Sequence, residues 1–496
     1  MPRTRNFWPI IAALAAGACA GGGAGITAPA APPDTAAPQL AREMRGVWIA
    51  TVANIDWPSR SSLSAEQQRA ELTELFDRAV SAGLNTVLLQ VRPAADAVYA
   101  STVEPWAAML TGRQGTDPGY DPLAFAVTEA HARGLQIHAW INPFRAGNAA
   151  DTMALATSHV FHTHRDLVRV YGSQLWLDPG EPAAQDYVIG VIDDIVERYD
   201  VDALHADDYF YPYPENDAAG HPLDFPDSAS YVRSGSALSR QDWRRQNVDR
   251  FVERLYREVH QLKPAVAVGI SPFGIWRPGN PSGVTGLDAF ASLYADSRKW
   301  LQQGWVDYLA PQLYWSISAP QQSFPALLDW WIAQNNAGRY VWPGLAAYRV
   351  GDGTSSAYAL SEIADEIRAV RTRPAGTGEL LYNATATLKR SNGAVASSIA
   401  PLYAMRAVVP PLTWLDSTPP AAPALTVSGR TVQFTPANPA DVRWWAVRVL
   451  AGGTWTTHVL FGDKRSLTIG ADPQRVIVNA VDQAGNASAE ASWRVP

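Results

Sequence analysis

Cysteine is almost absent from this sequence, since Cys19 is the only one among 496 residues. A single thiol excludes intramolecular disulfides and metal sites built from several thiolates. Charged residues are also scarce, at 18% of the chain, and the formal net charge is −7. Because binding to nucleic acid needs a basic face, this acidic balance argues against DNA or RNA as the partner.

Long apolar runs are absent beyond the N-terminus. Two arginines precede an apolar run, residues 7–18, which is too short to span a membrane as a mature helix and closes on small residues. We therefore predict a signal peptide over residues 1–18. Cys19 stands where a lipoprotein signal places its acylated cysteine, although Ala16 replaces the usual Leu. A chance cysteine before an ordinary cleavage site is the alternative interpretation.

The lipoprotein interpretation predicts an exported protein of the cell envelope, attached to the membrane by its N-terminal lipid anchor. Ala20 after the cysteine, rather than Asp, favours the outer membrane, facing the periplasm. Residues 19–41 combine the acylated Cys19 with a Gly-, Ala- and Pro-rich stretch, a composition typical of a tether because it cannot bury a core.

The remaining sequence is long and rich in aromatic residues. Hydrophobic residues make up 47% of the chain, which is enough for a large core. Its length exceeds one ordinary domain, although a barrel with insertions could occupy most of it. Nineteen Trp and eighteen Tyr are typical of sites for neutral, ring-shaped ligands, while ordinary core filling is the alternative for most of them.

From residue 42 onward, short apolar runs alternate with longer amphipathic ones. The first helical pattern begins with Ser64 and Gln67 in capping-box spacing and ends at Gly83. Repetition of strand and helix at this count predicts a (β/α)8 barrel over residues 42–416. A doubly wound sheet is the competing fold, but no Gly-rich phosphate turn follows the first strand. The eight strand-like runs are residues 44–52, 85–93, 135–144, 201–207, 265–273, 306–314, 340–348 and 378–386.

The last part of the chain, residues 417–496, follows a proline-rich stretch and has a different pattern. Short alternating runs separated by turn residues predict a small all-β sandwich. It resembles a fibronectin type III domain, above all in "VNAVDQAGN". Because proline-rich linkers carry few contacts, we expect the barrel to fold without it.

Polar residues gather where the strand-like runs end, and in barrels that rim carries the active site. Alternation along residues 201–207 turns His205 and Asp207 toward the lumen and Leu204 toward the helices. Asp208 then begins the loop. Two adjacent acids cannot both ionise cheaply, so their presence at one strand end calls for a functional explanation.

Six stretches occur in order at barrel spacing and together carry a family resemblance. They are "REMRGVWIATVANIDWPS", "LQVRPAADAVYAS", "HAWINPFR", "DALHADDYFYPYP", "GISPFGIW" and "LYADSRKWLQQGWVDYLAPQLYWS". The chain closely resembles the bacterial glycosyl-hydrolase-like family of exported barrel proteins, from residue 43 to about residue 405. The resemblance implies a glycosidase; that family includes lipoproteins acting on peptidoglycan glycan strands that have lost their stem peptides. Ala95 departs from the pattern, since relatives commonly have Gly there.

Adjacent acids suit substrate-assisted cleavage of an N-acetylated glycan. In that mechanism the 2-acetamido group of the substrate attacks, one carboxylate orients it and the other acid donates the proton. By analogy with hexosaminidases that carry such a pair after the fourth strand, Asp207 would hold the acetamido nitrogen and Asp208 would be the acid. The alternatives are that one Asp only caps or orients the loop, or that Asp96 acts across the cleft as base or nucleophile.

Further candidate site residues lie near the ends of the strand-like runs. His205 is expected to orient Asp207 by a hydrogen bond, with a core histidine as the alternative. Three histidines, His159, His162 and His164, suggest zinc, but no companion acid lies on a facing strand. We therefore predict no metal and no cofactor. The predicted substrate-binding residues are Arg92, Asn142, His205, Tyr209, Tyr211, Trp276, Gln312, Tyr314 and Trp315.

Three hypotheses of different classes remain. The first is a hydrolase that cleaves glycosidic bonds of cell-wall or related N-acetylated polysaccharide. The second is a glycan-binding envelope lipoprotein without activity, although a pure binder would have no reason to keep a proton donor. The third is a deacetylase, which would need a metal triad that the sequence does not show convincingly.

Overall fold

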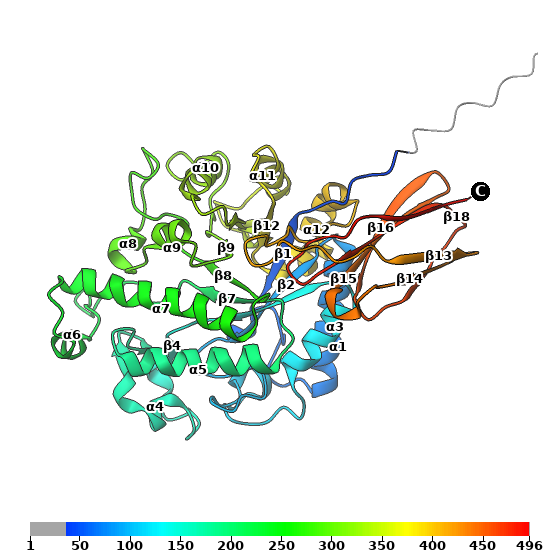
Figure 1. Ribbon diagram of the computed structural model, residues 1–496. Coiled ribbons are helices and arrows are strands. Elements are labelled where there is room, and N and C mark those ends of the chain that lie inside the picture. Colours follow the sequence, from blue (N-terminus) through cyan, green and yellow to red (C-terminus); the bar gives the residue numbers. More distant parts are fainter. Residues whose placement is uncertain (1–35, 496) are drawn as a thin grey trace, which may run out of the picture. The chain divides into compact units, whose positions relative to one another are not determined.

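Parallel strands form a closed ring in the computed structural model, which describes residues 36–495 (Figure 1). The strands are β1 (Met44–Ile49), β2 (Thr86–Arg92), β3 (Gln136–Ile141), β7 (Ala203–Asp207), β8 (Ala267–Ser271), β9 (Tyr308–Leu309), β10 (Tyr340–Val341), β11 (Gly344–Leu345) and β12 (Gly378–Leu381). Their order is β10-β9-β8-β7-β3-β2-β1-β12-β11. β10 and β11 lie on one run of chain and pair with β9 and β12, so the ring closes between them.

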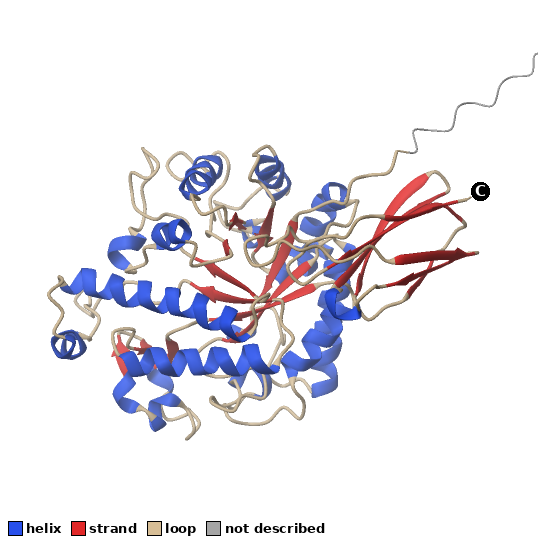
Figure 2. Ribbon diagram, in the orientation of Figure 1, coloured by secondary structure: helices blue, strands red, loops and turns tan. Residues whose placement is uncertain are grey.

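Helices follow the strands and surround them, as Figure 2 shows. They are α1 (Ala65–Ser81), α3 (Pro122–Ala132), α5 (Pro182–Arg198), α7 (Arg240–Leu262), α9 (Ser297–Gln303), α10 (Phe324–Gln334), α11 (Glu362–Arg371) and α12 (Ala394–Ile399). All eight predicted strand runs contain a strand of the ring. The predicted (β/α)8 fold is confirmed.

Local sequence explains where several helices begin. At α1 the Ser64 hydroxyl accepts from the Gln67 amide and the Gln67 side chain accepts from the Ser64 amide, so the predicted capping box is present. At α3 the Asp121 carboxylate accepts from two amides of the first turn, and Pro122 stands at the first helical position. Proline is tolerated there because that position has no intrahelical acceptor.

Aromatic and apolar side chains fill the lumen of the ring. Trp48, Trp140, Tyr308 and Trp342 belong to one buried cluster that also contains Met44. Gly269 of β8 has no side chain because the Tyr308 ring takes its space; a Cβ there would lie 1.9 Å from the Tyr308 Cζ. The barrel is therefore a packed core with no channel along its axis.

Long excursions on the site side of the barrel were not predicted from the sequence. Between β3 and α5 the chain forms a small antiparallel sheet, β4 (Arg145–Asn148), β5 (Val168–Tyr171) and β6 (Gln174–Leu177). The excursions also hold short helices α2 (Ala108–Thr111), α4 (Val160–Thr163), α6 (Ser228–Ser234) and α8 (Ala289–Ser292). Residues 289–303 form two helices, α8 and α9, with Tyr294 between them at φ 54°.

The C-terminal part forms two antiparallel sheets. The strands are β13 (Ala424–Ser428), β14 (Thr431–Thr435), β15 (Trp444–Ala451), β16 (Thr454–Phe461), β17 (Ser466–Thr468), β18 (Pro473–Val481) and β19 (Ala491–Arg494). β13, β14 and β17 make one sheet and β16, β15, β18 and β19 the other. Val432 and Phe434 of the first sheet share a core with Trp445, Val447 and Val476 of the second. This agrees with the predicted all-β sandwich; the fibronectin resemblance and the boundary near residue 417 stay predictions.

Extensive contacts join the sandwich to the amino ends of the barrel strands. Arg443 donates to Asp202 at 2.7 and 3.0 Å and to Asp200 at 2.7 Å. The His131 ring of α3 stacks on Phe461, with centroids 4.6 Å apart. A buried ion pair and stacked rings therefore connect the barrel and the sandwich, and folding of the barrel without the sandwich stays a prediction. No helix within residues 36–495 is long and apolar enough to cross a membrane.

Candidate active site

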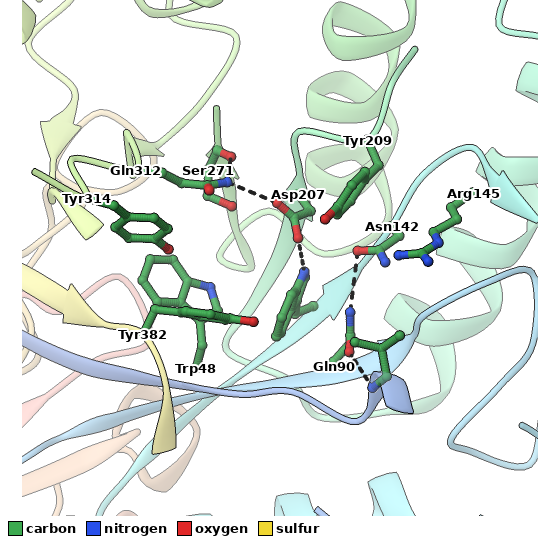
Figure 3. Close-up of a pocket in the computed structure, with 12 residues that line it drawn as sticks. Trp48, Gln90, Asn142, Arg145, Asp207, Tyr209, Ser271, Gln312, Tyr314 and Tyr382 are labelled. Atoms are coloured by element: carbon green, nitrogen blue, oxygen red, sulfur yellow. Dashed lines mark hydrogen bonds between the residues drawn. The ribbon is translucent and has the colours of Figure 1, made fainter. Parts of the chain in front are cut away.

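A cavity of about 200 Å³ opens at the carboxyl ends of the barrel strands (Figure 3). Asp207 is the only carboxylate among the side chains that line it, within the part of the chain that the structure describes. In barrels this rim is where active sites are built. The lining residues are Trp48, Val52, Gln90, Trp140, Asn142, Arg145, Asp207, Tyr209, Ser271, Gln312, Tyr314 and Tyr382.

Asp207 ends β7 with its carboxyl group held by three donors. Trp140 Nε1 donates to Oδ2 at 3.2 Å, while Gln312 Nε2 at 3.2 Å and the Asp208 amide at 2.9 Å donate to Oδ1. Burial raises the pKa of Asp207 to about 6, and the hydrogen bonds oppose that rise. At neutral pH the carboxylate is therefore mostly ionised and aimed at the cavity.

Asp208, the next residue, is buried and does not line the cavity. Its Oδ2 accepts a hydrogen bond from the Tyr213 hydroxyl. Burial, followed by the negative charge of Asp207, raises the pKa of Asp208 well above its usual value. Two like charges at short range cannot both form cheaply, so the negative charge of Asp207 makes Asp208 hold a proton more readily than an isolated carboxyl group would.

Stacked tyrosines form one side of the cavity. The rings of Tyr314 and Tyr382 lie 5.9 Å apart at an angle of 24°, and Tyr348 meets both edge-on. Figure 3 shows Asp207 between this side and a second side formed by Tyr209, Asn142 and Arg145. A cavity with flat rings and a few polar groups is suited to a sugar ring.

Asp96 lies in the wall of a second cavity, of about 410 Å³. Gln114 Nε2 donates to its carboxylate at 3.1 Å and the Ala94 amide donates at 3.2 Å. Burial raises its pKa to about 7. Val52 and Arg145 line both cavities, so the two adjoin. Asp96 and Asp207 therefore line two neighbouring cavities and do not share the same cavity.

Comparison with known proteins adds an independent observation. Residues 43–359 match a family described as glycosyl hydrolase-like 10. The chain belongs to this family. It is 41% identical over 398 residues to the glycosyl hydrolase YngK of Bacillus subtilis, covering 78% of this chain and 77% of that protein. It is 36% identical over 352 residues to the glycosyl hydrolase DigH of Escherichia coli strain K12, covering 66% and 78%. Among solved structures, the PgaB (BpsB) glycoside hydrolase domain from Bordetella bronchiseptica is 14% identical with a TM-score of 0.47, covering 73% of this chain and 98% of that one.

The structure brings together some of the predicted site residues of this glycosyl hydrolase-like protein. Asn142, Asp207, Tyr209, Gln312 and Tyr314 all line the first cavity. Asn142 is fixed by its Nδ2, which donates to the Pro93 carbonyl at 2.8 Å. Trp315 does not line it but packs edge-on against Phe273, whose ring also meets Tyr213, the partner of Asp208.

Besides Trp315, four predicted substrate-binding residues lie outside the cavity. Arg92 is fully buried and bound to both carboxylate oxygens of Glu104, at 2.7 and 2.9 Å. Tyr211 is fully buried against Phe225 and Tyr294. Both side chains are structural, because protein groups already surround them.

The other two, Trp276 and His205, also lie outside the cavity. Trp276 stacks on Trp330 and donates to Asp296. His205 lies in the lumen below the cavity, where its nitrogens meet Tyr308, Ser271 and Trp48. No hydrogen bond from His205 to Asp207 occurs among the described residues, so its expected orienting role is wrong. Trp140 and Gln312 orient Asp207 instead.

Several residues that line the first cavity were not predicted from the sequence. Trp48, Gln90, Ser271 and Tyr382 all lie in or just after predicted strand runs, so alternation along those runs could have indicated them. Gln90 accepts from the Thr51 and Val52 amides at 3.0 and 2.9 Å and so fixes the chain after β1. Arg145 ends the quoted motif "HAWINPFR", and only the turn of the chain into β4 brings it to the cavity.

The three neighbouring histidines do not form a metal centre. His159 precedes α4, and its ring accepts from the Phe161 amide at 3.1 Å. Burial lowers its pKa to about 4. Across residues 36–495 no group of three His, Cys, Asp or Glu side chains is placed to hold a metal ion.

Proposed function

We propose that this chain is a glycosidase that cleaves N-acetylated glycan strands of the bacterial cell wall by substrate assistance. The acid pair carries the proposal: Asp207 faces the cavity with a pKa of about 6, and Asp208, whose pKa is raised well above its usual value, follows it directly in the chain. Membership of the glycosyl hydrolase-like family supports a carbohydrate substrate.

Each acid has a distinct role in the proposed reaction. The Asp207 carboxylate accepts the N–H of the 2-acetamido group and stabilises the positive charge that grows as the acetamido oxygen attacks C1. The glycosidic oxygen takes the Asp208 proton as the C1–O bond breaks. Because Asp208 does not line the cavity, its side chain must leave Tyr213 to deliver that proton. Water then opens the cyclic intermediate, with Asp208 accepting a proton.

A two-carboxylate mechanism is the competing proposal. The observation in its favour is Asp96, a second carboxyl group with a pKa of about 7 in the adjoining cavity. In that case a covalent glycosyl-enzyme would form on Asp96 or Asp207.

Attachment to the outer membrane through Cys19 remains part of the proposal. Cys19 and the signal peptide lie outside the described residues. The sequence pattern alone supports this location.

The test compares two substitutions on two substrates. Asp208→Asn should lower turnover of purified glycan strands by roughly 10²- to 10⁴-fold and recover partly on an aryl glycoside, whose leaving group needs no proton. Asp207→Asn should lose turnover on both substrates. Asp117→Asn, an exposed aspartate that lines neither cavity, is the control.

An inhibitor separates the two mechanisms. N-acetylglucosamine thiazoline mimics the cyclic intermediate and should inhibit the unsubstituted protein but bind Asp207→Asn poorly. A thiazoline without effect, together with a trapped glycosyl group on Asp96 or Asp207, would establish the two-carboxylate mechanism instead. Full activity of both aspartate variants would place the catalytic site elsewhere.

A further inference from the structure

Arg145 lies at the boundary of the two cavities, where its charge lowers the pKa of Asp207. Its side chain lines both of them. Within residues 36–495 its guanidinium makes no hydrogen bond or ion pair, and Nε is buried without a partner. The Tyr209 ring covers one face of the guanidinium, 5.7 Å from centroid to Cζ. The N–H edges remain for a ligand.

Arg92, at the same rim of the barrel, is an arginine whose donors are filled by protein groups. It ends the neighbouring strand β2, and Glu104 and the carbonyl of Pro143 occupy its donors. Leaving a partly buried charge unpaired is costly, because protein groups then do not replace the water it loses. Arg145 has the charge of Asp207 nearby, but within residues 36–495 no acceptor fills its donors. An anionic ligand that pairs with it accounts for this.

The second cavity offers such a ligand room beside Arg145. Together the two cavities fall within the roughly 300–1,000 Å³ that ligand sites occupy. Ala53, Met109 and Leu155 give the second cavity an apolar wall. Its acids are engaged: Gln114 binds Asp96, and Asn148 binds Asp151 at 3.0 Å. Arg113 adds an exposed positive charge.

We propose that the second cavity binds the sugar next to the cleaved one, and that Arg145 pairs with a carboxylate carried by that sugar. This rests on the proposed function, which puts an N-acetylated sugar in the first cavity. A planar guanidinium with free edges matches a carboxylate through two parallel hydrogen bonds. A sugar whose carboxyl group is blocked as an amide loses this pairing. Arg145 thereby distinguishes free acids from peptide-substituted sugars.

Two kinds of sugar carry such a carboxylate: a lactyl ether on an N-acetylated sugar, and a uronic acid. The test therefore uses four tetrasaccharides. One alternates N-acetylglucosamine with N-acetylmuramic acid; the second is the same glycan with its lactyl carboxyl groups converted to methylamides. The third is chitotetraose, which has no carboxyl group, and the fourth is a hyaluronan tetrasaccharide with uronic acids.

Binding is measured by calorimetry on the whole chain carrying Asp208→Asn, so that no glycan is consumed. Adding Arg145→Gln should weaken binding of the lactyl or uronate glycan by about 10- to 100-fold, the range for hydrogen bonds to charged groups. It should leave chitotetraose and the methylamide glycan unchanged. Arg60→Gln, an exposed arginine that lines neither cavity, removes the same charge and should change nothing.

The glycan that loses more affinity in Arg145→Gln identifies the source of the carboxylate. A loss on the lactyl glycan indicates the lactyl ether, and a loss on hyaluronan indicates a uronic acid. An equal loss of affinity for all four glycans, or no loss for any of them, would overturn the proposal, because Arg145 would then not recognise the carboxylate. Turnover by the unsubstituted protein is measured separately: if it cleaves no glycan, the glycosidase proposal fails while the charge-dependent binding still reports on Arg145.

Discussion

Replacing Arg443 by Met should lower the free energy of unfolding of the protein, because this arginine is the main cation beside the buried carboxylate of Asp202. Asp202 is 4% exposed in its side chain and Arg443 is 9% exposed. Asp202 directly precedes β7, and its Oδ2 also accepts from the Ile137 amide of β3 at 2.8 Å. Removing one partner of a buried pair typically costs about 3–5 kcal/mol, since the other charge stays buried. We expect a loss in that range at pH 7.

The loss should depend on pH. Burial alone would raise the pKa of Asp202, but the charge of Arg443, with help from His131, holds it well below its usual range. A lowered pKa contributes stability above the unfolded value of about 3.9, and that stability is lost as the pH falls through the folded value. Without Arg443, burial dominates and the pKa rises, so Asp202 protonates already in mild acid. The difference between the two proteins should therefore shrink from pH 7 to pH 4.5.

Urea unfolding at both pH values measures this effect. The matched control is Arg430→Met, which removes the arginine of an exposed pair with Asp472, 2.8 Å long, inside the sandwich. Exposed pairs contribute about 0–1 kcal/mol. If Arg443→Met costs no more than Arg430→Met, or costs the same at both pH values, the buried pair does not hold the sandwich to the barrel.

Three further predictions concern the acid pair and the anchor. kcat/KM should fall about tenfold per pH unit below about pH 6, because Asp207 must be ionised and its pKa is about 6; Tyr213→Phe should move the alkaline limb to higher pH, because the Tyr213 hydroxyl lowers the pKa of Asp208. An acid limb unchanged in Asp207→Asn, or an alkaline limb unmoved in Tyr213→Phe, would count against these roles. Cys19→Ser should move the protein from the membrane to the soluble fraction, since the acyl anchor is lost; unchanged fractionation would rule out the anchor.

The barrel could be predicted because its signals are local. Each strand run is a short apolar stretch, and several helices begin at a residue whose side chain caps the first turn, as at Ser64 and Gln67. The rim residues at the end of β7 followed from alternation, which turns Asp207 inward. The small sheet β4–β6 escaped prediction because its strands have four residues each, too few for a periodic pattern.

Side-chain roles were harder to predict than positions. Arg92 resembles a substrate-binding residue until Glu104, twelve positions away in a loop, is known to neutralise it. Tyr209 and Tyr211 have similar sequence surroundings, yet the loop path puts the first in the cavity and the second in the core. Asp208 was expected to act beside Asp207, but it does not line the cavity and its Oδ2 accepts from the Tyr213 hydroxyl. Long-range packing decides each case.

The excursion between β3 and α5 links the second cavity to the acid pair. Asp207 stands on a strand of the ring, while Arg145, Asn148 and Leu155 belong to this one continuous segment. The segment also touches the loop after β7, since Trp176 Nε1 donates to the Phe210 carbonyl at 2.9 Å and the Arg145 charge lowers the pKa of Asp207. A graft of residues 145–177 between family members should therefore change ligand preference and the acidity of Asp207 together.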